Sequence, residues 1–317
     1  MLASYVVDSG SPDSLRLGQL DAPAPGPGHV LVRVQASSLD RVDTYIRRGT
    51  HGMAVTGPTI LGRDVAGTVV RTGPGVTGFT AGDAVVGLTT GAHAEYAVVP
   101  ATHCFPRPAA LDAVHAAAVP TAGRTAYDAV VNLAGVRPGD RVLVVAAAGA
   151  VGTFAVQYAH HLGARVFGTS APAKADAVRA LGALDVVDHY RPDVVESLRA
   201  ALPGGEVDVI VESVGGTLWS DVLKVLAPGG RLVTCGVTAD SHAHLHLGRL
   251  MVKGWTLRGI GRPGPEAVAG QLREALTLSA VTAAPAIAAT YPLEQATVAH
   301  DRLEASEFVG RIVLTTG

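Results

Sequence analysis

The sequence predicts an α/β chain in which a doubly wound parallel sheet is combined with a separate β-rich domain. Two observations carry this prediction. Short apolar strands separated by Gly, Pro and Asp turns occupy the chain up to about residue 120. From Thr121 onward the pattern changes to helices that alternate with strands, which is typical of a parallel sheet covered by helices.

The clearest unit of the second half runs from Arg141 to Ser170. It begins with the apolar, β-branched run 142–145, as expected of a strand buried on both faces of a sheet. A turn of small residues and a helical apolar pattern follow, and residues 164–168 resemble a second strand. The small residues of the turn are Ala146, Gly149 and Gly152. Such a turn lets a pyrophosphate approach the backbone amides at a helix N-terminus, so the unit predicts a dinucleotide-binding site.

The end of the second strand indicates which dinucleotide is bound. Sites that prefer NAD place an Asp or Glu about twenty residues past the glycines, where it binds the ribose 2′-hydroxyl. This chain has Thr169 and Ser170 there, followed by Lys174, and no carboxylate in that segment. Hydroxyl groups beside an ammonium group suit a 2′-phosphate. The sequence therefore predicts NADPH.

Composition excludes several classes of protein. Of the 317 residues, 48% are hydrophobic and 16% are charged, which is typical of a globular chain large enough for two domains. A formal net charge of −2 gives no reason to expect nucleic acid or a membrane as partner. Two cysteines, Cys104 and Cys235, make a disulfide framework or a cysteine-built zinc site implausible. Without a signal-peptide pattern at the N-terminus, we expect a cytoplasmic enzyme.

The elements expected in the first half are short. Strands are predicted around 5–7, 30–34, 67–70 and 84–87, and a short helix around 39–49.

The second half continues with βα units. Residues 207–212 are a predicted buried strand, and residues 219–226 a helix that Pro228, Gly229 and Gly230 close. Strands are expected at 231–235 and 256–260. The tail is predicted to form a helix, a strand, a helix and a final strand, at 266–276, 287–290, 293–303 and 311–314.

A set of motifs now identifies a family. The motifs are DTYIRRG (43–49), LGRDVAG (61–67), GDAV (82–85), AEYAVV (94–99), AAAGAVG (146–152), VDVIVESVGG (207–216), LAPGGRLV (226–233) and GRIVL (310–314). Together they resemble the medium-chain dehydrogenase/reductases, and more narrowly the zinc-free quinone oxidoreductase branch that includes zeta-crystallin. The resemblance extends over essentially the whole chain, in the order of the family.

The resemblance implies a domain arrangement and a cofactor site. A GroES-like catalytic domain is expected at 1–120, completed by 262–317, with a Rossmann domain at 121–261. NADPH is expected in the interdomain cleft with the substrate stacked on its nicotinamide, and the protein as a homodimer or tetramer, of which we favour the homodimer. The expected cofactor-binding residues are Thr125, Ala148, Gly149, Ala150, Val151, Gly152, Ser170, Lys174, Tyr190, Ser213 and Gly236, with Ser170, Lys174 and Tyr190 around the 2′-phosphate.

The resemblance also allows a test for zinc. Zinc-dependent relatives place Cys, His and Glu where this chain has Asp40, Arg63 and Asp64. Catalytic zinc needs three protein ligands and an open position, and an arginine cannot be a ligand. The four-cysteine lobe of structural zinc is absent as well. The alternating histidines, His242, His244 and His246, are expected to lie in a solvated loop, so no metal is expected.

The expected catalytic residues depart from the family pattern. Tyr45 matches the tyrosine that lines the substrate pocket, and Asp40 replaces the usual Asn. An ionised Asp40 cannot donate a hydrogen bond to a substrate carbonyl, whereas a protonated one can. His51 stands where a second tyrosine is frequent, and Arg124 replaces an apolar residue. These four residues are the candidate catalytic groups.

Three functions are consistent with the sequence. The first is NADPH-dependent, zinc-independent hydride transfer to a quinone or an α,β-unsaturated carbonyl compound. The second is a redox-neutral cyclase or isomerase of a biosynthetic pathway, with Asp40 or His51 as acid–base groups. The third is a non-enzymatic NADPH-binding protein. An intact nucleotide site favours the first two.

Overall fold

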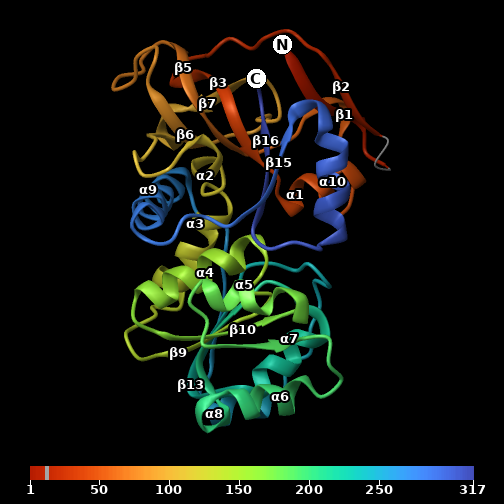
Figure 1. The fold of residues 1–317 in the computed structure, drawn as a ribbon, viewed down its shortest axis with the longest axis vertical. Coiled ribbons are helices and arrows are strands. Elements are labelled where there is room, and N and C mark those ends of the chain that lie inside the picture. Colours follow the sequence, from red (N-terminus) through yellow and green to blue (C-terminus); the bar gives the residue numbers. More distant parts are fainter. Residues whose placement is uncertain (11–13) are drawn as a thin grey trace. The chain divides into compact units, whose positions relative to one another are not determined.

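The computed structural model describes residues 1–10 and 14–317 and divides into two compact units. Unit 1 comprises Met1–Arg124, Pro263–Glu307 and Arg311–Gly317. Unit 2 comprises Thr125–Arg262 and Phe308–Gly310. In Figure 1 the colours from red to yellow and the blue tail belong to unit 1, and green and teal belong to unit 2.

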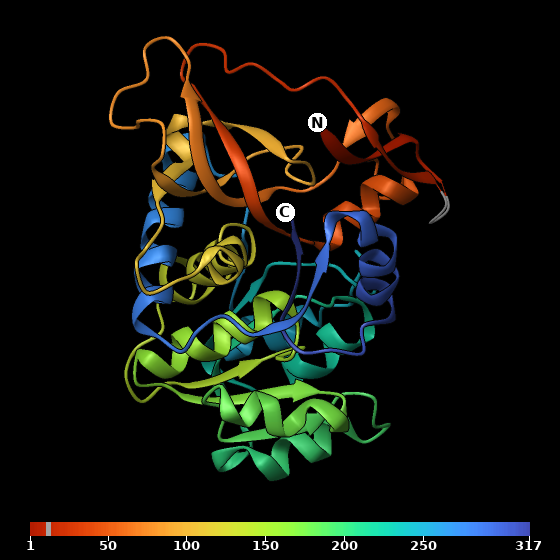
Figure 2. The same cartoon turned by 45° about the horizontal axis from the view of Figure 1, so that its top comes forward.

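Unit 1 contains two sheets. The smaller one has the strand order β2-β1-β4, and the larger one has β15-β16-β3-β5-β6-β8, with β7 pairing to β3. Figure 2 shows β3 and β5 side by side, drawn in red to orange. The strands of both sheets are β1 (Leu2–Asp8), β2 (Leu15–Gln19), β3 (His29–Ser38), β4 (Thr56–Ile60), β5 (Asp64–Thr72), β6 (Ala84–Leu88), β7 (Tyr96–Pro100), β8 (Cys104–Pro106), β15 (Ile287–Pro292) and β16 (Arg311–Thr315).

Alternation along these strands builds the core of unit 1. In β3, Val30, Val32 and Val34 are buried and point to one face, as the two-residue period of a strand requires. They pack with inward-facing residues of the neighbouring strands, among them Val65, Val69, Val85, Ala97 and Val99.

The helices of unit 1 lie around these sheets. They are α1 (Arg41–Arg48), α2 (Ala113–Ala117), α9 (Pro265–Val281) and α10 (Ala296–Ala305), and α3 (Ala122–Tyr127) runs across the boundary with unit 2. The C-terminal strand β16 pairs antiparallel with β3, Val313 opposite Ser38. The tail therefore completes the sheet that the N-terminal part begins.

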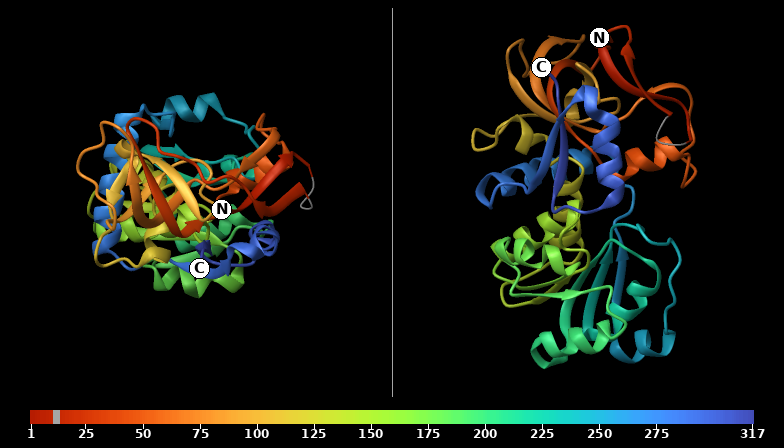
Figure 3. Two further views of the ribbon diagram at one scale, coloured as in Figure 1. Left: turned by 90° about the horizontal axis from the view of Figure 1, so that it is seen from above. Right: turned by 45° about the vertical axis from the view of Figure 1, so that its right-hand side comes forward.

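Unit 2 is a six-stranded parallel sheet with the order β11-β10-β9-β12-β13-β14. Figure 3 (right) shows its strands running side by side in green and teal. The chain order reverses between β9 and β12, the point at which ligands bind in sheets of this kind. The strands are β9 (Arg141–Val144), β10 (Arg165–Ser170), β11 (Asp185–Asp188), β12 (Val207–Glu212), β13 (Leu226–Thr234) and β14 (Thr256–Gly259).

Helices cover both faces of this sheet, which accounts for its nearly continuous apolar strands. Helices α4 (Ala150–His161) and α5 (Ala175–Ala180) lie on one face and α6 (Val194–Ala201), α7 (Gly216–Val222) and α8 (Leu247–Lys253) on the other. On the second face Leu198, Leu223 and Trp255 pack against the strand residues Leu143 and Ile210. The predicted fold class is thus confirmed.

One predicted helix end is wrong. Helix α7 ends at Val222 and continues as a 3₁₀ turn to Val225, and Leu226 already belongs to β13. The Pro-Gly-Gly segment 228–230 is a bulge within that strand, since Leu226 pairs with Val207 but Arg231 pairs with Val209. Proline and glycine suit such a bulge as well as they suit a helix end.

In the described part of the chain, no helix has both the length and the apolar character needed to cross a bilayer.

Candidate active site

The turn after β9 holds an alanine in a glycine conformation. Ala146 has a φ of +52°, in the left-handed region that favours glycine. Its amide donates a hydrogen bond to Thr169 Oγ1 at 3.1 Å, and its carbonyl accepts one from the amide of Gly149 at 2.9 Å. Ala146 therefore replaces the first glycine of the usual fingerprint, while its backbone keeps a conformation that favours glycine.

Gly152 allows this turn to close. A Cβ atom at Gly152 would lie 2.3 Å from the carbonyl oxygen of Ala146 and 2.8 Å from Cα of Ala147. Gly149 is the N-cap residue of α4, a helix of 12 residues that begins directly at the turn. The positive end of this helix and its first amides face the carboxyl end of β9. The geometry suits a pyrophosphate group.

Neighbouring strand ends bring Ser170 and Asp188 together. Ser170 is the last residue of β10, and it pairs in register with Asp188, the last residue of β11. The Ser170 hydroxyl is buried and donates to the carbonyl of Ala171 at 2.9 Å. Tyr190 is 76% exposed, and Lys174 ends the 3₁₀ turn that follows β10.

Two residues of this corner escaped the sequence reasoning. His189 Nδ1 lies 3.2 Å from Thr169 Oγ1, and its ring meets that of Tyr190 edge-on, with the centroids 4.4 Å apart. Burial lowers the pKa of His189, the nearby Asp188 charge acts against this, and the Lys174 charge reinforces it. Residues 169–174 contain no carboxylate, but parallel pairing brings Asp188, which is distant in sequence, beside Ser170.

The remaining cofactor candidates lie at the same edge of the sheet or in α3. Ser213 follows β12 and Gly236 follows β13, and a Cβ atom at Gly236 would lie 2.7 Å from the carbonyl oxygen of Ser213. Ala148, Ala150 and Val151 belong to the turn and the start of α4. Thr125 is buried in α3, with 8% of its surface exposed.

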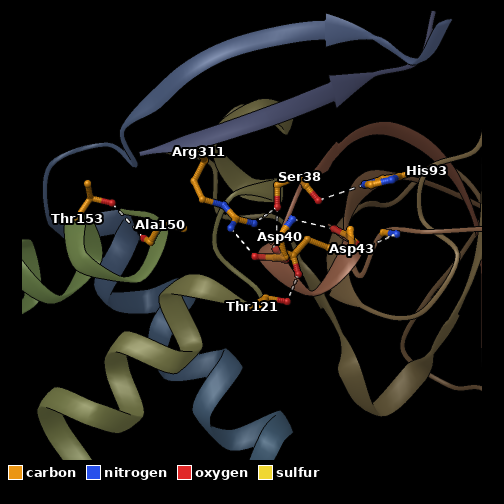
Figure 4. A network of polar contacts seen from close by, with 10 residues as sticks. Ser38, Asp40, Asp43, His93, Thr121, Ala150, Thr153 and Arg311 are labelled. Carbon is orange, nitrogen blue, oxygen red and sulfur yellow. Dashed lines mark hydrogen bonds and ion pairs between the residues drawn. The ribbon is translucent and has the colours of Figure 1, made fainter. Parts of the chain in front are cut away.

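In unit 1, Asp40 pairs with an arginine from the far end of the sequence. Asp40 is the N-cap residue of α1, and its Oδ1 accepts a hydrogen bond from Nη1 of Arg311 at 2.5 Å. Nη2 of Arg311 donates to Asp64 Oδ2 at 2.9 Å and to the Ser38 hydroxyl. Figure 4 shows Arg311 reaching from β16 into this cluster. Arg63, by contrast, is exposed.

The cluster contains a second and a third carboxylate. Asp64 also accepts from the hydroxyls of Thr121 at 2.5 Å and Ser38 at 2.7 Å. Asp43 accepts from the amides of Asp40 at 2.7 Å and Gly62 at 3.0 Å. Burial, reinforced by the charge of Asp40, raises the pKa of both Asp43 and Asp64 to about 7, against the pull of Arg311.

The other candidate catalytic residues, Tyr45, His51 and Arg124, have surroundings different from those of Asp40. Tyr45 and the exposed His51 stack, with ring centroids 4.1 Å apart and planes at 29°. His51 adopts a φ of +57°. Arg124 donates through Nη1 to Gln271 Oε1 in α9 at 2.8 Å. The structure thus brings Tyr45 and His51 together, and it gives Asp40 a different partner, Arg311.

Two buried histidines belong to the same unit. His93 and His300 meet edge-on with their centroids 6.2 Å apart. His93 Nε2 lies 3.4 Å from the carbonyl of Ser38, and neither ring nitrogen of His300 has a hydrogen-bond partner among the described residues. Burial lowers the pKa of His93 to about 4 and that of His300 well below its ordinary value.

Metal-ligating side chains do not gather in the described ranges 1–10 and 14–317: no group of three or more His, Cys, Asp or Glu has the geometry to hold a metal ion. Of the alternating histidines, His242 is exposed and lies 3.2 Å from Asp240 Oδ1. His246 is the N-cap residue of α8.

Family models match both halves of the chain. The alcohol dehydrogenase GroES-like domain matches residues 26–109, and the zinc-binding dehydrogenase family matches residues 150–279.

Similar proteins include enzymes of about the same length and segments of much longer ones. A 2-haloacrylate reductase of Burkholderia sp is 31% identical over 99% of this chain and 98% of its own length. The spectinabilin polyketide synthase system protein NorB of Streptomyces orinoci is 38% identical over 93% of this chain. This chain spans 13% or less of the length of the polyketide synthases it matches.

A solved structure extends the similarity to three dimensions. The Escherichia coli quinone oxidoreductase, determined in complex with NADPH, is 29% identical, covers 99% of this chain and all of its own, and superimposes with a TM-score of 0.89. With the matched motifs, the parallel sheet and the nucleotide turn, these similarities lead to one conclusion. The chain belongs to the medium-chain dehydrogenase/reductase superfamily, in its quinone oxidoreductase-like branch.

Proposed function

We propose that the chain is a zinc-independent, NADPH-dependent reductase that transfers hydride to an α,β-unsaturated carbonyl compound or a quinone. The observation that carries the proposal is the nucleotide turn. Gly152 leaves no room for a side chain beside Ala146, and the turn opens directly onto the N-terminus of α4. A chain that had lost its nucleotide would have no need of this strained backbone.

The residues of the site fit NADPH. Gly149, Gly152 and the first turn of α4 would hold the pyrophosphate, and Ser170, Lys174 and Tyr190 the 2′-phosphate. The same cofactor occupies the similar Escherichia coli enzyme. When bound, NADPH supplies a hydride from its nicotinamide ring. Ser213, Gly236 and Thr125 would complete its binding site.

Arg311 supports a reaction without zinc. Its guanidinium binds Asp40 and Asp64, which occupy positions that hold Cys and Glu in zinc-dependent relatives. A permanent cation between these carboxylates competes with a metal ion for both of them. The charge on the substrate oxygen then needs hydrogen-bond donors from the protein, for which Tyr45, His51 and Arg124 are the candidates.

An unsaturated carbonyl compound is the favoured substrate class. The name of the 2-haloacrylate reductase denotes an α,β-unsaturated acid, and that enzyme matches this chain over 98% of its own length. Hydride addition to the β-carbon of such a compound leaves an enolate that must be protonated, so the site needs a proton donor. Asp40 and the stacked pair of Tyr45 and His51 provide groups of this kind.

The deciding experiment follows the nicotinamide absorbance of chelator-treated protein with enones and quinones. NADPH and NADH are compared with each substrate. Turnover that prefers NADPH and survives chelation supports the proposal. Tight binding of NADPH without oxidation would refute it and favour a redox-neutral cyclase or isomerase, and the absence of binding would refute it as well. Mass spectrometry of the product identifies the bond that is reduced.

A further inference from the structure

The carboxyl ends of β10 and β11 form a corner of unit 2 that carries a histidine. We call this group the strand-end corner, and its residues are Thr169, Ser170, Lys174, Asp188, His189 and Tyr190. Asp188 Oδ1 accepts a hydrogen bond from the amide of Tyr190 at 2.9 Å, which holds the turn that carries His189. The rings of His189 and Tyr190 meet edge-on, with the centroids 4.4 Å apart. His189 therefore has a defined place among the residues proposed for the 2′-phosphate.

A chain of hydrogen bonds determines which ring nitrogen of His189 carries the proton. The Thr169 hydroxyl is buried and accepts from the amide of Ala146 at 3.1 Å. Its own proton needs an acceptor, and His189 Nδ1, at 3.2 Å, is the one acceptor that the described residues offer it. Nδ1 therefore accepts from Thr169, and the single proton of the neutral ring lies on Nε2.

The outer nitrogen of this ring is open to a ligand. In the described chain, His189 Nε2 has no hydrogen-bond partner and is not buried. Burial of the rest of the ring lowers the pKa of His189 below its ordinary value of 6.5, while the Asp188 charge opposes this and the Lys174 charge reinforces it. The ring is thus neutral at pH 8, and it presents one N–H donor at Nε2.

A donor is what a 2′-phosphate requires, because its oxygens accept hydrogen bonds and carry negative charge. The Ser170 hydroxyl is 2% exposed and already donates to the carbonyl of Ala171 at 2.9 Å. It must give up this bond before it can donate to a phosphate oxygen. His189 Nε2 gives up no bond with a described residue. The histidine is therefore the better placed donor of the two.

We propose that His189 determines the preference for NADPH together with Lys174, by donating a hydrogen bond from Nε2 to the 2′-phosphate. Thr169 is then a positioning residue, because its hydroxyl holds the ring in the tautomer that donates outward. NADH has no phosphate at this position, so it gains less from the donor. This inference rests on the proposed NADPH-dependent function.

Calorimetric titration of the full chain at pH 8 tests the donor without turnover. The probes are adenosine 2′,5′-bisphosphate and AMP, which differ only in the 2′-phosphate. His189→Asn keeps an acceptor near the position of Nδ1 and removes Nε2, so it should weaken binding of the bisphosphate about 10- to 100-fold and that of AMP less than about twofold. His189→Gln, whose amide nitrogen extends to the position of Nε2, should restore most of this affinity. The matched control is His161→Asn, at the exposed end of α4, which should change neither affinity.

The outcomes of this titration separate the two proposals. If the wild-type chain prefers the bisphosphate and His189→Asn binds it equally well, the role of His189 is overturned while the NADPH site stands. If the wild-type chain binds the two probes equally, both the NADPH preference and the role of His189 are overturned. If the chain oxidises no NADPH, the proposed reductase fails, whereas the titration still decides the role of His189.

Nitrogen-15 spectra of the histidine rings at pH 8 test the tautomer without any ligand. The His189 signals are assigned by their loss in His189→Asn. We expect the proton on Nε2 in the wild type and in Thr169→Ser, which keeps the hydroxyl, and a mixture of both tautomers in Thr169→Val. A proton on Nδ1 in the wild type would overturn the proposal, and an unchanged tautomer in Thr169→Val would refute the positioning role of Thr169.

Discussion

Nη1 of Arg311 lies 2.5 Å from Oδ1 of Asp40, although the two residues are 271 positions apart in the sequence. The contact is possible because β16 pairs with β3, and Asp40 follows β3 at the start of α1. The C-terminal strand thus supplies the only cation that we find hydrogen-bonded to Asp40 or Asp64 in the described chain.

Replacing Arg311 by methionine should strongly destabilise unit 1. The substitution keeps much of the side-chain volume but leaves Asp40 and Asp64 buried without their cation. Loss of one partner of a buried ion pair costs about 3–5 kcal/mol. The measurement is the free energy of unfolding in urea. The loss of unfolding free energy should be larger at pH 8 than at pH 5, because protonation of the carboxylates at the lower pH removes their unpaired charge.

Arg48→Met is the matched control for this substitution. Arg48 also forms an ion pair, with Glu304 at 2.8 Å, but its side chain is 51% exposed. Exposed pairs contribute between about 0 and 1 kcal/mol, so Arg48→Met should change stability little. Equal losses in the two variants would contradict a special role for Arg311.

The fold was largely predictable because its signals are local. Apolar runs such as 142–145 and 207–212 form strands that are buried on both faces of the sheet. The turn that connects the first of these strands to α4 consists of small residues. Strand β11 at Asp185–Asp188 was missed because it is only four residues long. The bulge in β13 was missed because Pro-Gly-Gly terminates a helix as readily as it interrupts a strand.

The site was predictable only in part, because its key contacts are not local. The motif GRIVL contains Arg311, but nothing in the sequence places this arginine beside Asp40. Asp188 and Ser170 are likewise separated in sequence and joined by strand pairing. The glycine turn, by contrast, is formed within seven consecutive residues, and its spacing alone indicates its geometry.

Ala146→Gly should stabilise the protein. Ala146 has a φ of +52°, a conformation that costs an alanine about 1–2 kcal/mol but is open to glycine. The greater conformational freedom of glycine in the unfolded chain offsets part of this gain. The net increase in the free energy of unfolding should be about 0.5–1 kcal/mol. The measurement is thermal or urea unfolding. The control is Ala180→Gly at the exposed end of α5, which should lose up to about 1 kcal/mol. A loss of stability in both variants would contradict the strain at Ala146.

His300→Leu should make the protein more resistant to acid. Burial, with the charges of His93 and Arg47, lowers the pKa of His300 in the folded state, while the unfolded chain takes up a proton near pH 6.5. Stability from this group is therefore present above pH 6.5 and is lost as the pH falls toward the lowered folded value. As the pH falls from 8 to 5, the free energy of unfolding of the variant should therefore rise by about 2 kcal/mol relative to that of the wild type.

The pH comparison isolates His300 from the acids nearby. Asp43 and Asp64 have raised pKa values, so they contribute with the opposite sign: their stabilisation is present at low pH and is lost as the pH rises to about 7. The contributions of Asp43 and Asp64 are present in both the wild type and the variant, so they cancel when the two free energies of unfolding are subtracted. Urea unfolding at several pH values measures this difference, and a difference that does not depend on pH would show that His300 is not held neutral.

Lys174→Ala should weaken binding of NADPH far more than binding of NADH. Lys174 ends the 3₁₀ turn that follows β10, and only NADPH carries a 2′-phosphate for its ammonium group. A charge-assisted hydrogen bond contributes about 1.5–3 kcal/mol, which corresponds to a rise in KM for NADPH of about 10- to 100-fold. The KM for NADH should change less than about twofold by the same arithmetic.

The control is Lys224→Ala, which removes a surface lysine paired with Asp221 and should leave both constants unchanged. Equal effects of Lys174→Ala on the two cofactors would place the 2′-phosphate elsewhere, and Asp188, paired in register with Ser170, would then account for a preference for the unphosphorylated ribose.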